Sequence, residues 1–308
     1  MSTIRKAIIT AAGRGTRQYP ASKTVQKELF PLVDTDGYTK PTLQIIAQEC
    51  IDSGIEEICI VTNPQNGGAI KAHFTNPTPS ERVALGGKEW AIKLADELAA
   101  MAARVHIVVQ EAQEGFGHAI YQAKDWAGSD PVLVLLGDHV YLANPGYENC
   151  SRQVLDSYAR WDAPVSSVDV VTEDSVTRLG IIKGQELGNG AYKVLDLVEK
   201  PTIAQAQADL TTPGIESGKY LGHFEIHAFP NAIFEKLGYL IEHNLRRKDE
   251  FQLTSAQELL MRGSPTYIAQ RVHGRRFDTG QPEELILTQL ELAIASPYRS
   301  RILEALGR

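Results

Sequence analysis

The chain has 308 residues, of which 43% are hydrophobic and 22% are charged, and its formal net charge at pH 7 is -7. A chain of this length can bury a full hydrophobic core, as one large domain or two closely packed ones. The acidic balance and the lack of a long basic stripe argue against nucleic acid as a partner. No apolar run reaches the ~20 residues of a membrane span, and the start lacks a signal peptide. Three widely spaced cysteines without a C-x-x-C motif predict buried thiols. We therefore expect a cytoplasmic protein that does not bind membranes.

The first predicted element is a short buried strand at 7–9, which runs into a glycine-rich and basic loop at 11–31. Gly13 and Gly15 let the backbone approach a ligand closely, so that successive N–H groups can point at anionic oxygens. The loop also carries several cations, namely Arg14, Arg17, Lys23 and Lys27, which only Glu28 opposes. In an acidic chain, this local positive charge predicts a phosphate-binding site, with an ordinary glycine turn as the alternative.

The loop matches neither of two better-known phosphate motifs. It contains no G-x-x-x-x-G-K-[ST], and Gln18 stands where the G-x-G-x-x-G dinucleotide fingerprint needs its third glycine. A nicotinamide-dependent oxidoreductase is therefore disfavoured, and we expect phosphate to be bound by another scheme.

Helices and strands alternate in the first half of the chain. Apolar spacing and turn residues predict strands at 58–61, 105–109 and 132–136, and helices at 43–51, 90–101 and 115–127. Unbroken apolar strands separated by helices are typical of a parallel sheet covered on both faces, whose ligands bind beyond the carboxyl ends of the strands. Polar pairs follow three of these strands, namely Thr62-Asn63, Gln110-Glu111 and Gly137-Asp138.

The second half changes character. Strands of mixed direction are predicted at 165–171, 180–183, 192–198, 220–228 and 266–272, with a mobile loop at 201–218 and helices after Pro230, near Thr254 and at 283–306. Thr254 with Gln257, or Ser255 with Glu258, would form a capping box for the second of these helices. We divide the chain softly into 1–145 and 146–308, which are expected to pack as one compact unit.

Two carboxylates are candidates for metal binding. Asp138 and Asp278 are far apart in sequence, and each lies among turn-forming residues. Such a pair suits a hard cation that takes few protein ligands and leaves its other positions to phosphate and water, which fits Mg²⁺. Lys200, between Glu199 and Pro201, is placed to meet a second phosphate, while Glu199 would accept hydrogen bonds from sugar hydroxyls. A surface ion pair before a proline is the alternative.

Taken in order, the motifs resemble the sugar-nucleotide pyrophosphorylases, most closely the bacterial UTP-glucose-1-phosphate uridylyltransferases. The similarity covers nearly the whole chain: A-A-G-R-G-T-R, P-A-S-K-x-x-x-K-E, Q-E-A-Q-E-G-F-G-H-A, L-L-G-D, L-G-I-I, V-E-K-P, E-F-Q-L-T and F-D-T-G. The resemblance implies a Rossmann-like, glycosyltransferase-A-like α/β fold, with a mostly parallel central sheet covered by helices and a mixed β part that binds sugar. It also implies a nucleotidyltransferase that joins UTP to glucose 1-phosphate with Mg²⁺, releases pyrophosphate and forms a homo-oligomer.

Matched by position, the resemblance assigns roles to residues of this chain. Ala12, Gly13 and Gly15 would meet the nucleotide through the backbone, and Gln110 and Gly115 would read the base. Arg17 and Lys27 would hold the triphosphate, Asp138 and Asp278 the metal, Gly180 and Glu199 the sugar, and Lys200 the sugar phosphate. His118 and His139 are expected not to act as general bases, and the role of Glu28 stays open.

Some positions depart from the family pattern. Arg14 and Gln26 replace usual apolar and proline residues, 35–39 is inserted, His139 follows Asp138, and Ser255 follows Q-L-T. These changes leave the base and the sugar open, so dTTP, CTP or another sugar 1-phosphate is a same-class alternative. A catalytically silent nucleotide-sugar sensor is an alternative of another class, and the presence of both Asp138 and Asp278 argues against it.

Overall fold

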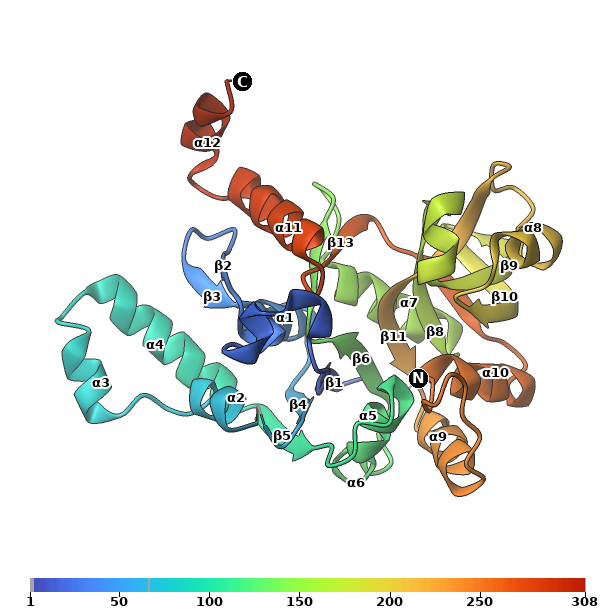
Figure 1. Ribbon diagram of the computed structural model, residues 1–308, viewed down its shortest axis with the longest axis horizontal. Helices are drawn as coiled ribbons and strands as arrows, with labels where there is room; N and C mark the ends of the chain where they lie inside the picture. The colour runs from blue at the N-terminus through green and yellow to red at the C-terminus, as the bar shows by residue number, and fades with distance from the viewer. Residues whose placement is uncertain (1–2, 66, 308) are drawn as a thin grey trace.

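The computed structural model describes residues 3–65 and 67–307 and is built around one nine-stranded sheet of order β5-β4-β1-β6-β11-β8-β12-β10-β9 (Figure 1). Its first four strands are β1 (Lys6–Ala11), β4 (Glu57–Thr62), β5 (Val105–Val109) and β6 (Val132–Leu136). All the pairings among them are parallel, which confirms the predicted α/β sheet. Their carboxyl ends therefore lie along one edge, where the polar pairs and the glycine loop emerge.

The remaining strands of the sheet have mixed direction, as predicted. They are β8 (Val165–Thr172), β9 (Gly180–Gly188), β10 (Ala191–Glu199), β11 (Lys219–Phe229) and β12 (Ile268–Arg271). The β8–β12 pair is parallel, whereas β11 pairs antiparallel with β6, β8 and β9, and β10 antiparallel with β9 and β12. Because β11 hydrogen-bonds to β6, one sheet continues from the first half of the chain into the second.

The described chain also contains α-helices, several of which cover the sheet. They are α1 (Thr42–Asp52), α2 (Gly67–His73), α3 (Pro79–Ala84), α4 (Glu89–Ala102), α5 (Phe116–Gln122), α6 (Lys124–Ala127), α7 (Cys150–Trp161), α8 (Ile203–Asp209), α9 (Ala232–Glu242), α10 (Leu253–Gly263), α11 (Pro282–Ala295) and α12 (Arg299–Ala305). Ile9 belongs to a core cluster with residues of α1 and α7, whereas its neighbour Ile8 belongs to a second cluster with residues of α5, α9 and α10. Since successive side chains of a strand point to opposite faces, the sheet is buried on both.

Short elements complete the chain. The 3-10 helices are η1 (Thr16–Gln18), η2 (Ala21–Lys23), η3 (Lys27–Leu29) and η4 (Glu173–Arg178), and the small strands β2 (Pro31–Val33) and β3 (Thr39–Pro41) form a hairpin. The turn of that hairpin holds the insertion 35–39, where Lys40 Nζ lies 2.6 Å from carboxylate oxygens of both Asp34 and Asp36. Cys50, Cys59 and Cys150 are buried free thiols, as predicted.

Several local predictions were wrong. The expected loop at 201–218 contains α8, which Thr202 caps by accepting a hydrogen bond from Gln205 N at 3.1 Å. The helix at 115–127 breaks at Ala123 into α5 and α6, and the C-terminal helix breaks at Ser296 before α12. No capping box forms near Thr254, because α10 already begins at Leu253 without a side-chain cap.

A two-stranded ribbon of β7 (His139–Ala143) and β13 (Gly274–Asp278) was not predicted. The strands run antiparallel, and the register places Asp278 opposite His139. Thr279 then donates from both its backbone N and its Oγ1 to the carbonyl oxygen of Asp138, at 2.9 and 2.8 Å. This ribbon therefore holds the second predicted metal acid beside the first.

Two parts of the chain extend away from the sheet in Figure 1: the arm of α3 and α4, and the C-terminal α12. α12 buries none of its residues, and Trp90 and Ile92 of α4 are among the exposed large hydrophobic residues. No helix in the described part of the chain is long and apolar enough to cross a membrane.

We predict that Glu49, on α1, makes stability depend on pH. Its carboxylate accepts a hydrogen bond from Ser151 N at 2.8 Å, at the start of α7, yet burial raises the pKa of Glu49 to about 7. Between pH 4.5 and 7 the unfolded chain releases a proton that the folded chain keeps, so this group lowers stability as pH rises. Glu49→Gln should therefore raise the free energy of unfolding by roughly 2–3 kcal/mol at pH 8 and by little at pH 4.5.

Urea denaturation at both pH values measures this difference. Glu56→Gln is the matched control, because Glu56 is an exposed partner of Arg5 at 3.6 Å. An equal change for Glu49→Gln at both pH values would show that Glu49 is ionised in the folded protein.

Candidate active site

A cleft of about 1070 Å³ lies beyond the carboxyl ends of the parallel strands. It is lined by ten of the residues selected from the sequence, namely Ala12, Gly13, Arg17, Lys27, Gln110, Gly115, Asp138, Glu199, Lys200 and Asp278. Gly15 and Gly180 lie behind this lining: a Cβ on Gly15 would meet Ser22 and Lys27, and one on Gly180 would meet His223 and Glu199. The structure thus gathers residues from the ends of five strands (β1, β5, β6, β10 and β13) and from both halves of the chain.

Asp138 and Asp278 converge on Gly280. A Cβ on this glycine would lie 2.5 Å from Asp138 Oδ2 and 2.8 Å from Asp278 Oδ1, so only glycine leaves room for both carboxylates. With His139, they form a group whose possible ligand atoms all lie within 4.8 Å of one another. His139 was expected to be only a neighbour of the metal site; its Nε2 lies 3.8 Å from Asp278 Oδ1, and burial lowers the pKa of the ring.

Two cations of the phosphate loop contact these acids. Lys27 Nζ bonds to Asp138 Oδ2, and Arg17 Nη1 lies 3.2 Å from Asp278 Oδ2. Burial of Asp138 favours its neutral form, but the charges of Lys27, His139 and Arg17 and the hydrogen bond from Lys27 together outweigh burial and lower the pKa of the carboxyl. Burial opposes the charge of Lys27 as well, yet Asp138 and Glu28 raise its pKa. Asp138 and Lys27 therefore hold each other in their charged forms in the cleft.

Glu28, whose role the sequence left open, is 1% exposed. Lys27 Nζ lies 3.7 Å from its Oε1, while burial raises the pKa of Glu28 to about 7. Its Cγ would be 3.2 Å from a Cβ on Gly137, beside the first metal acid. Glu28 is thus a buried neighbour of Lys27 in the lining of the cleft.

Hydrogen bonds shape the phosphate loop. Gly15 has a left-handed backbone with φ 62° at the start of η1, a conformation that favours glycine. Gln18, in place of the third glycine of a dinucleotide fingerprint, donates to Thr279 O at 2.8 Å and so joins the loop to the F-D-T-G turn. Gln26, in place of the usual proline, donates to Ala11 O.

At the other side of the loop, Gln110 donates to Gly115 O at 3.3 Å, and the His118 ring lies 3.0 Å from its amide nitrogen. His118 also contacts Ala112 O, Gln122 and Glu114, which is consistent with the expected structural role. Gln113, which sequence reasoning missed, donates to Ala12 O at 2.6 Å.

The other end of the cleft contains Glu199 and Lys200. Glu199 Oε2 accepts a hydrogen bond from Thr254 Oγ1 at 2.8 Å, and Glu199 Oε1 lies 3.4 Å from Lys200 Nζ. Lys200 has a left-handed backbone with φ 46°, and its side chain is 48% exposed. Strained backbone of this kind clusters at ligand-binding sites.

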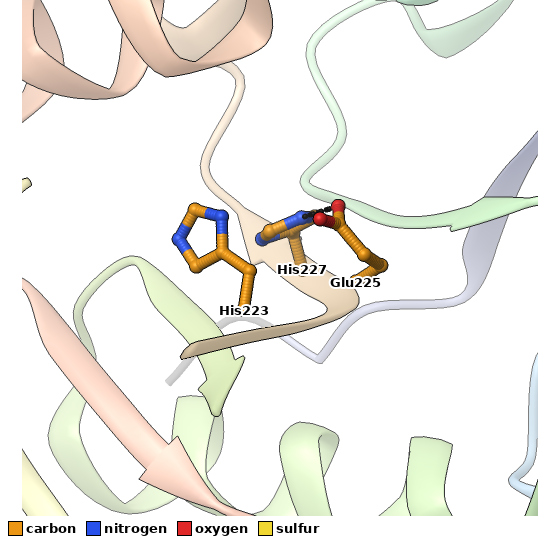
Figure 2. A group of neighbouring side chains, drawn as sticks. All are labelled: His223, Glu225 and His227. Atoms are coloured by element: carbon orange, nitrogen blue, oxygen red, sulfur yellow. Dashed lines mark hydrogen bonds and ion pairs between the residues drawn. The ribbon is translucent and has the colours of Figure 1, made fainter. Parts of the chain in front are cut away.

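Sequence reasoning also missed His223, Glu225 and His227, which line the cleft from β11 (Figure 2). Their H-x-E-x-H spacing, which puts alternate residues of a strand on one face, was the available signal.

Arg14 is predicted to contribute little to nucleotide binding. Its Nε donates to Gln113 Oε1 at 2.6 Å, and the contact is exposed to solvent. Arg14→Leu should therefore change the apparent affinity for UTP less than threefold and leave its salt dependence unchanged, because exposed polar pairs contribute about 0–1 kcal/mol. Titrations at low and high salt measure both quantities. A large loss of affinity with a flatter salt dependence would show that Arg14 reaches the triphosphate.

Comparison with known proteins shows the family of the chain. A sequence model of the nucleotidyl transferase family matches residues 6–293, and the chain therefore belongs to that family. The chain is 35% identical over 300 residues to UTP–glucose-1-phosphate uridylyltransferase 2 of Streptococcus pyogenes serotype M3, covering 96% of this chain and 93% of the relative. It is 34% identical over 296 residues to UTP–glucose-1-phosphate uridylyltransferase of Bacillus subtilis, covering 96% and 92%.

Solved structures support the same relationship. UDP-glucose pyrophosphorylase from Acinetobacter baumannii superimposes with a TM-score of 0.81 at 25% identity and covers 98% of both chains. A UDP-glucose pyrophosphorylase complexed with UDP-glucose has a TM-score of 0.76 at 26% identity and covers 94% of this chain and 98% of that one. These comparisons confirm the resemblance and the fold predicted from the motifs, and this chain is a nucleotidyltransferase.

Proposed function

We propose that this enzyme joins UTP to glucose 1-phosphate to give UDP-glucose and pyrophosphate. The observation that carries the proposal is the convergence of Asp138 and Asp278 on Gly280, beside Lys27 and Arg17. The names of the relatives support the choice of UTP and glucose 1-phosphate.

The proposed reaction is a direct transfer. An oxygen of the sugar phosphate attacks the α-phosphorus of UTP, and the bond from that phosphorus to the bridging oxygen of the β-phosphate breaks. Pyrophosphate leaves in line, so no covalent enzyme intermediate is needed. Both reactants are anions, so positioning and charge stabilisation are the main tasks of the residues around them.

Asp138 and Asp278 fit Mg²⁺, because two converging carboxylates leave coordination positions for phosphate oxygens and water. When bound, Mg²⁺ would neutralise phosphate charge and polarise the reacting phosphoryl group. Lys27 and Arg17 contact the two carboxylates in the structure. When the triphosphate binds, both cations would contact it instead, since phosphate is an equally suitable partner for them.

The two ends of the cleft suit the two substrates. We assign the backbone of Ala12 and Gly13, with Gln110 and Gly115, to the base and ribose, because an amide can offer both a donor and an acceptor to a pyrimidine. Glu199 and Gly180 are assigned to the sugar, and Lys200 to its phosphate. On this proposal, residues 1–145 mainly bind the nucleotide and residues 146–308 mainly bind the sugar. Asp278 belongs to the second part but would bind the metal beside Asp138 of the first.

We also propose that the enzyme is a homo-oligomer. Apolar residues on α11 and around α12 are exposed, including Ile286 and Tyr298, and α12 has no buried residue in the chain by itself. Light scattering of the purified chain tests this, and a monomer at every concentration would contradict it.

Substrate selection tests the proposed reaction. Pyrophosphate release is measured for UTP, dTTP, CTP, ATP and GTP against glucose, galactose, N-acetylglucosamine and mannose 1-phosphates, with and without Mg²⁺. We expect the highest kcat/KM for UTP with glucose 1-phosphate. A partly buried carboxylate that loses a hydrogen-bond donor is destabilised, which disfavours sugars that lack a hydroxyl for Glu199. A higher value for dTTP or for an N-acetylated sugar would contradict the substrate assignment and keep the reaction class.

A further inference from the structure

Two histidines and a glutamate converge in the cleft apart from the two metal acids. His223, Glu225 and His227 all lie on β11, and their possible ligand atoms are within 4.8 Å of one another. Figure 2 shows the His227 ring between the His223 ring and the Glu225 carboxylate in this view. His227 Nε2 lies 3.4 Å from Glu225 Oε2.

The backbone of β11 brings the three side chains together. Alternate residues of a regular strand share a face, but their side chains stand roughly parallel. Here the pairing of β11 with β8 shifts register between His223 and His227, and Glu225 has a left-handed φ of 69°. Bulges of this type aim side chains and are over-represented beside active sites, and a left-handed glutamate is strained.

The cluster is buried but incompletely satisfied. His227 is 0% and His223 4% exposed, and His223 Nε2 has no hydrogen-bond partner among the described residues. The Glu225 side chain is 18% exposed, and no arginine or lysine of the described chain forms a salt bridge with it. No arginine or lysine of the described residues bonds directly to this shielded carboxylate, so a bound metal ion would supply a direct cationic partner.

The surroundings are those of a metal ligand set. Ser166 Oγ lies 2.8 Å from His227 Nδ1 and bonds in turn to Tyr267 OH and Gln257 Nε2, which fixes the orientation of the imidazole ring. Ligating histidines characteristically have their second nitrogen held in this way. The charge of Arg276 opposes a cation here, and Glu225 offsets it.

We propose that His223, Glu225 and His227 bind a divalent transition-metal ion of the zinc class, separate from the magnesium site at Asp138 and Asp278. Two imidazoles and one carboxylate suit Zn²⁺ and leave a fourth position open. That position would be reached from the sugar end of the cleft, because His223 Nδ1 and Glu199 Oε2 lie 2.6 and 3.2 Å from where a Gly180 Cβ would be. Mg²⁺ prefers oxygen ligands, so the two sites differ in the ion that they favour.

Zinc binding to the metal-stripped full chain, measured by competition with a chromophoric chelator, tests this proposal without any substrate. We expect one tight Zn²⁺ per chain. His223→Gln and Glu225→Gln should each weaken zinc affinity by at least about 100-fold. The reason is that substituting a residue that only hydrogen-bonds to a metal ligand already costs about 10–100-fold in affinity. Ser166→Ala removes the hydrogen-bond partner of His227 Nδ1 and should weaken zinc affinity by about 10–100-fold. Cobalt substitution should give the visible absorption of a four-coordinate site, which His223→Gln should remove.

Two controls separate the sites. His243→Gln removes an exposed histidine that directly follows α9 and is not part of this cluster, and it should change nothing. Asp278→Asn should leave zinc binding intact. Circular dichroism verifies that each variant is folded. Unchanged zinc affinity in both His223→Gln and Glu225→Gln, loss of zinc in Asp278→Asn, or no binding at millimolar Zn²⁺ would each overturn the proposal, whatever the nucleotide substrate proves to be.

Discussion

Asp138→Asn and Asp278→Asn should each lower kcat by on the order of a hundredfold or more with the fold intact. Each substitution keeps the shape of the side chain but removes a negative charge from the proposed magnesium site. The neighbouring cations Lys27 and Arg17 then lose their partners, and the metal loses one of two carboxylate ligands. Steady-state rates at saturating Mg²⁺ and substrates measure the effect.

The matched control is Asp156→Asn, because Asp156 is an exposed acid paired with Arg152 at 2.9 Å on α7. Its turnover should equal that of the unmodified enzyme. Near-normal turnover in either active-site variant would remove that residue from the metal site.

Lys200→Ala should raise the KM for glucose 1-phosphate by roughly 10–100-fold and change the KM for UTP much less. A charge-assisted contact to phosphate is worth roughly 1.5–3 kcal/mol. Lys200 is placed for this contact by its left-handed backbone and by Glu199, 3.4 Å from its Nζ. Initial rates with each substrate varied in turn separate the two constants.

Lys193→Ala serves as the control, because Lys193 lies on the same strand β10 but does not line the cleft. An equal rise in both KM values for Lys200→Ala would mean that Lys200 does not distinguish the sugar phosphate from the nucleotide.

The parallel half of the sheet could be predicted because its signals are local. Each strand is a largely apolar run, and two of them are followed within two residues by a polar side chain that lines the cleft, namely Gln110 after β5 and Asp138 after β6. The α8 helix also had a local signal that was overlooked: Thr202 and Gln205 have the S/T-x-x-Q spacing of a helix start.

Non-local contacts set the rest of the site. Nothing in the spacing of Asp278 places it beside Asp138; the antiparallel β7–β13 ribbon does. The sequence paired the two acids by residue type and turn context, and the family resemblance implied that they act together. Likewise, the sequence around Thr254 predicts a helix cap. In the structure, the Thr254 hydroxyl instead donates a hydrogen bond to Glu199, which is distant in sequence. The convergence of His223 with His227 depends on a bulge that the pairing of β11 produces.

The most direct measurement of the proposed function is product identification by mass spectrometry after incubation with UTP, glucose 1-phosphate and Mg²⁺. The account predicts UDP-glucose and pyrophosphate in equal amounts, no product in the presence of a chelator, and a strongly reduced rate for Asp278→Asn. UTP binding without any product under these conditions would contradict the proposed transfer and would favour a silent nucleotide-sugar sensor.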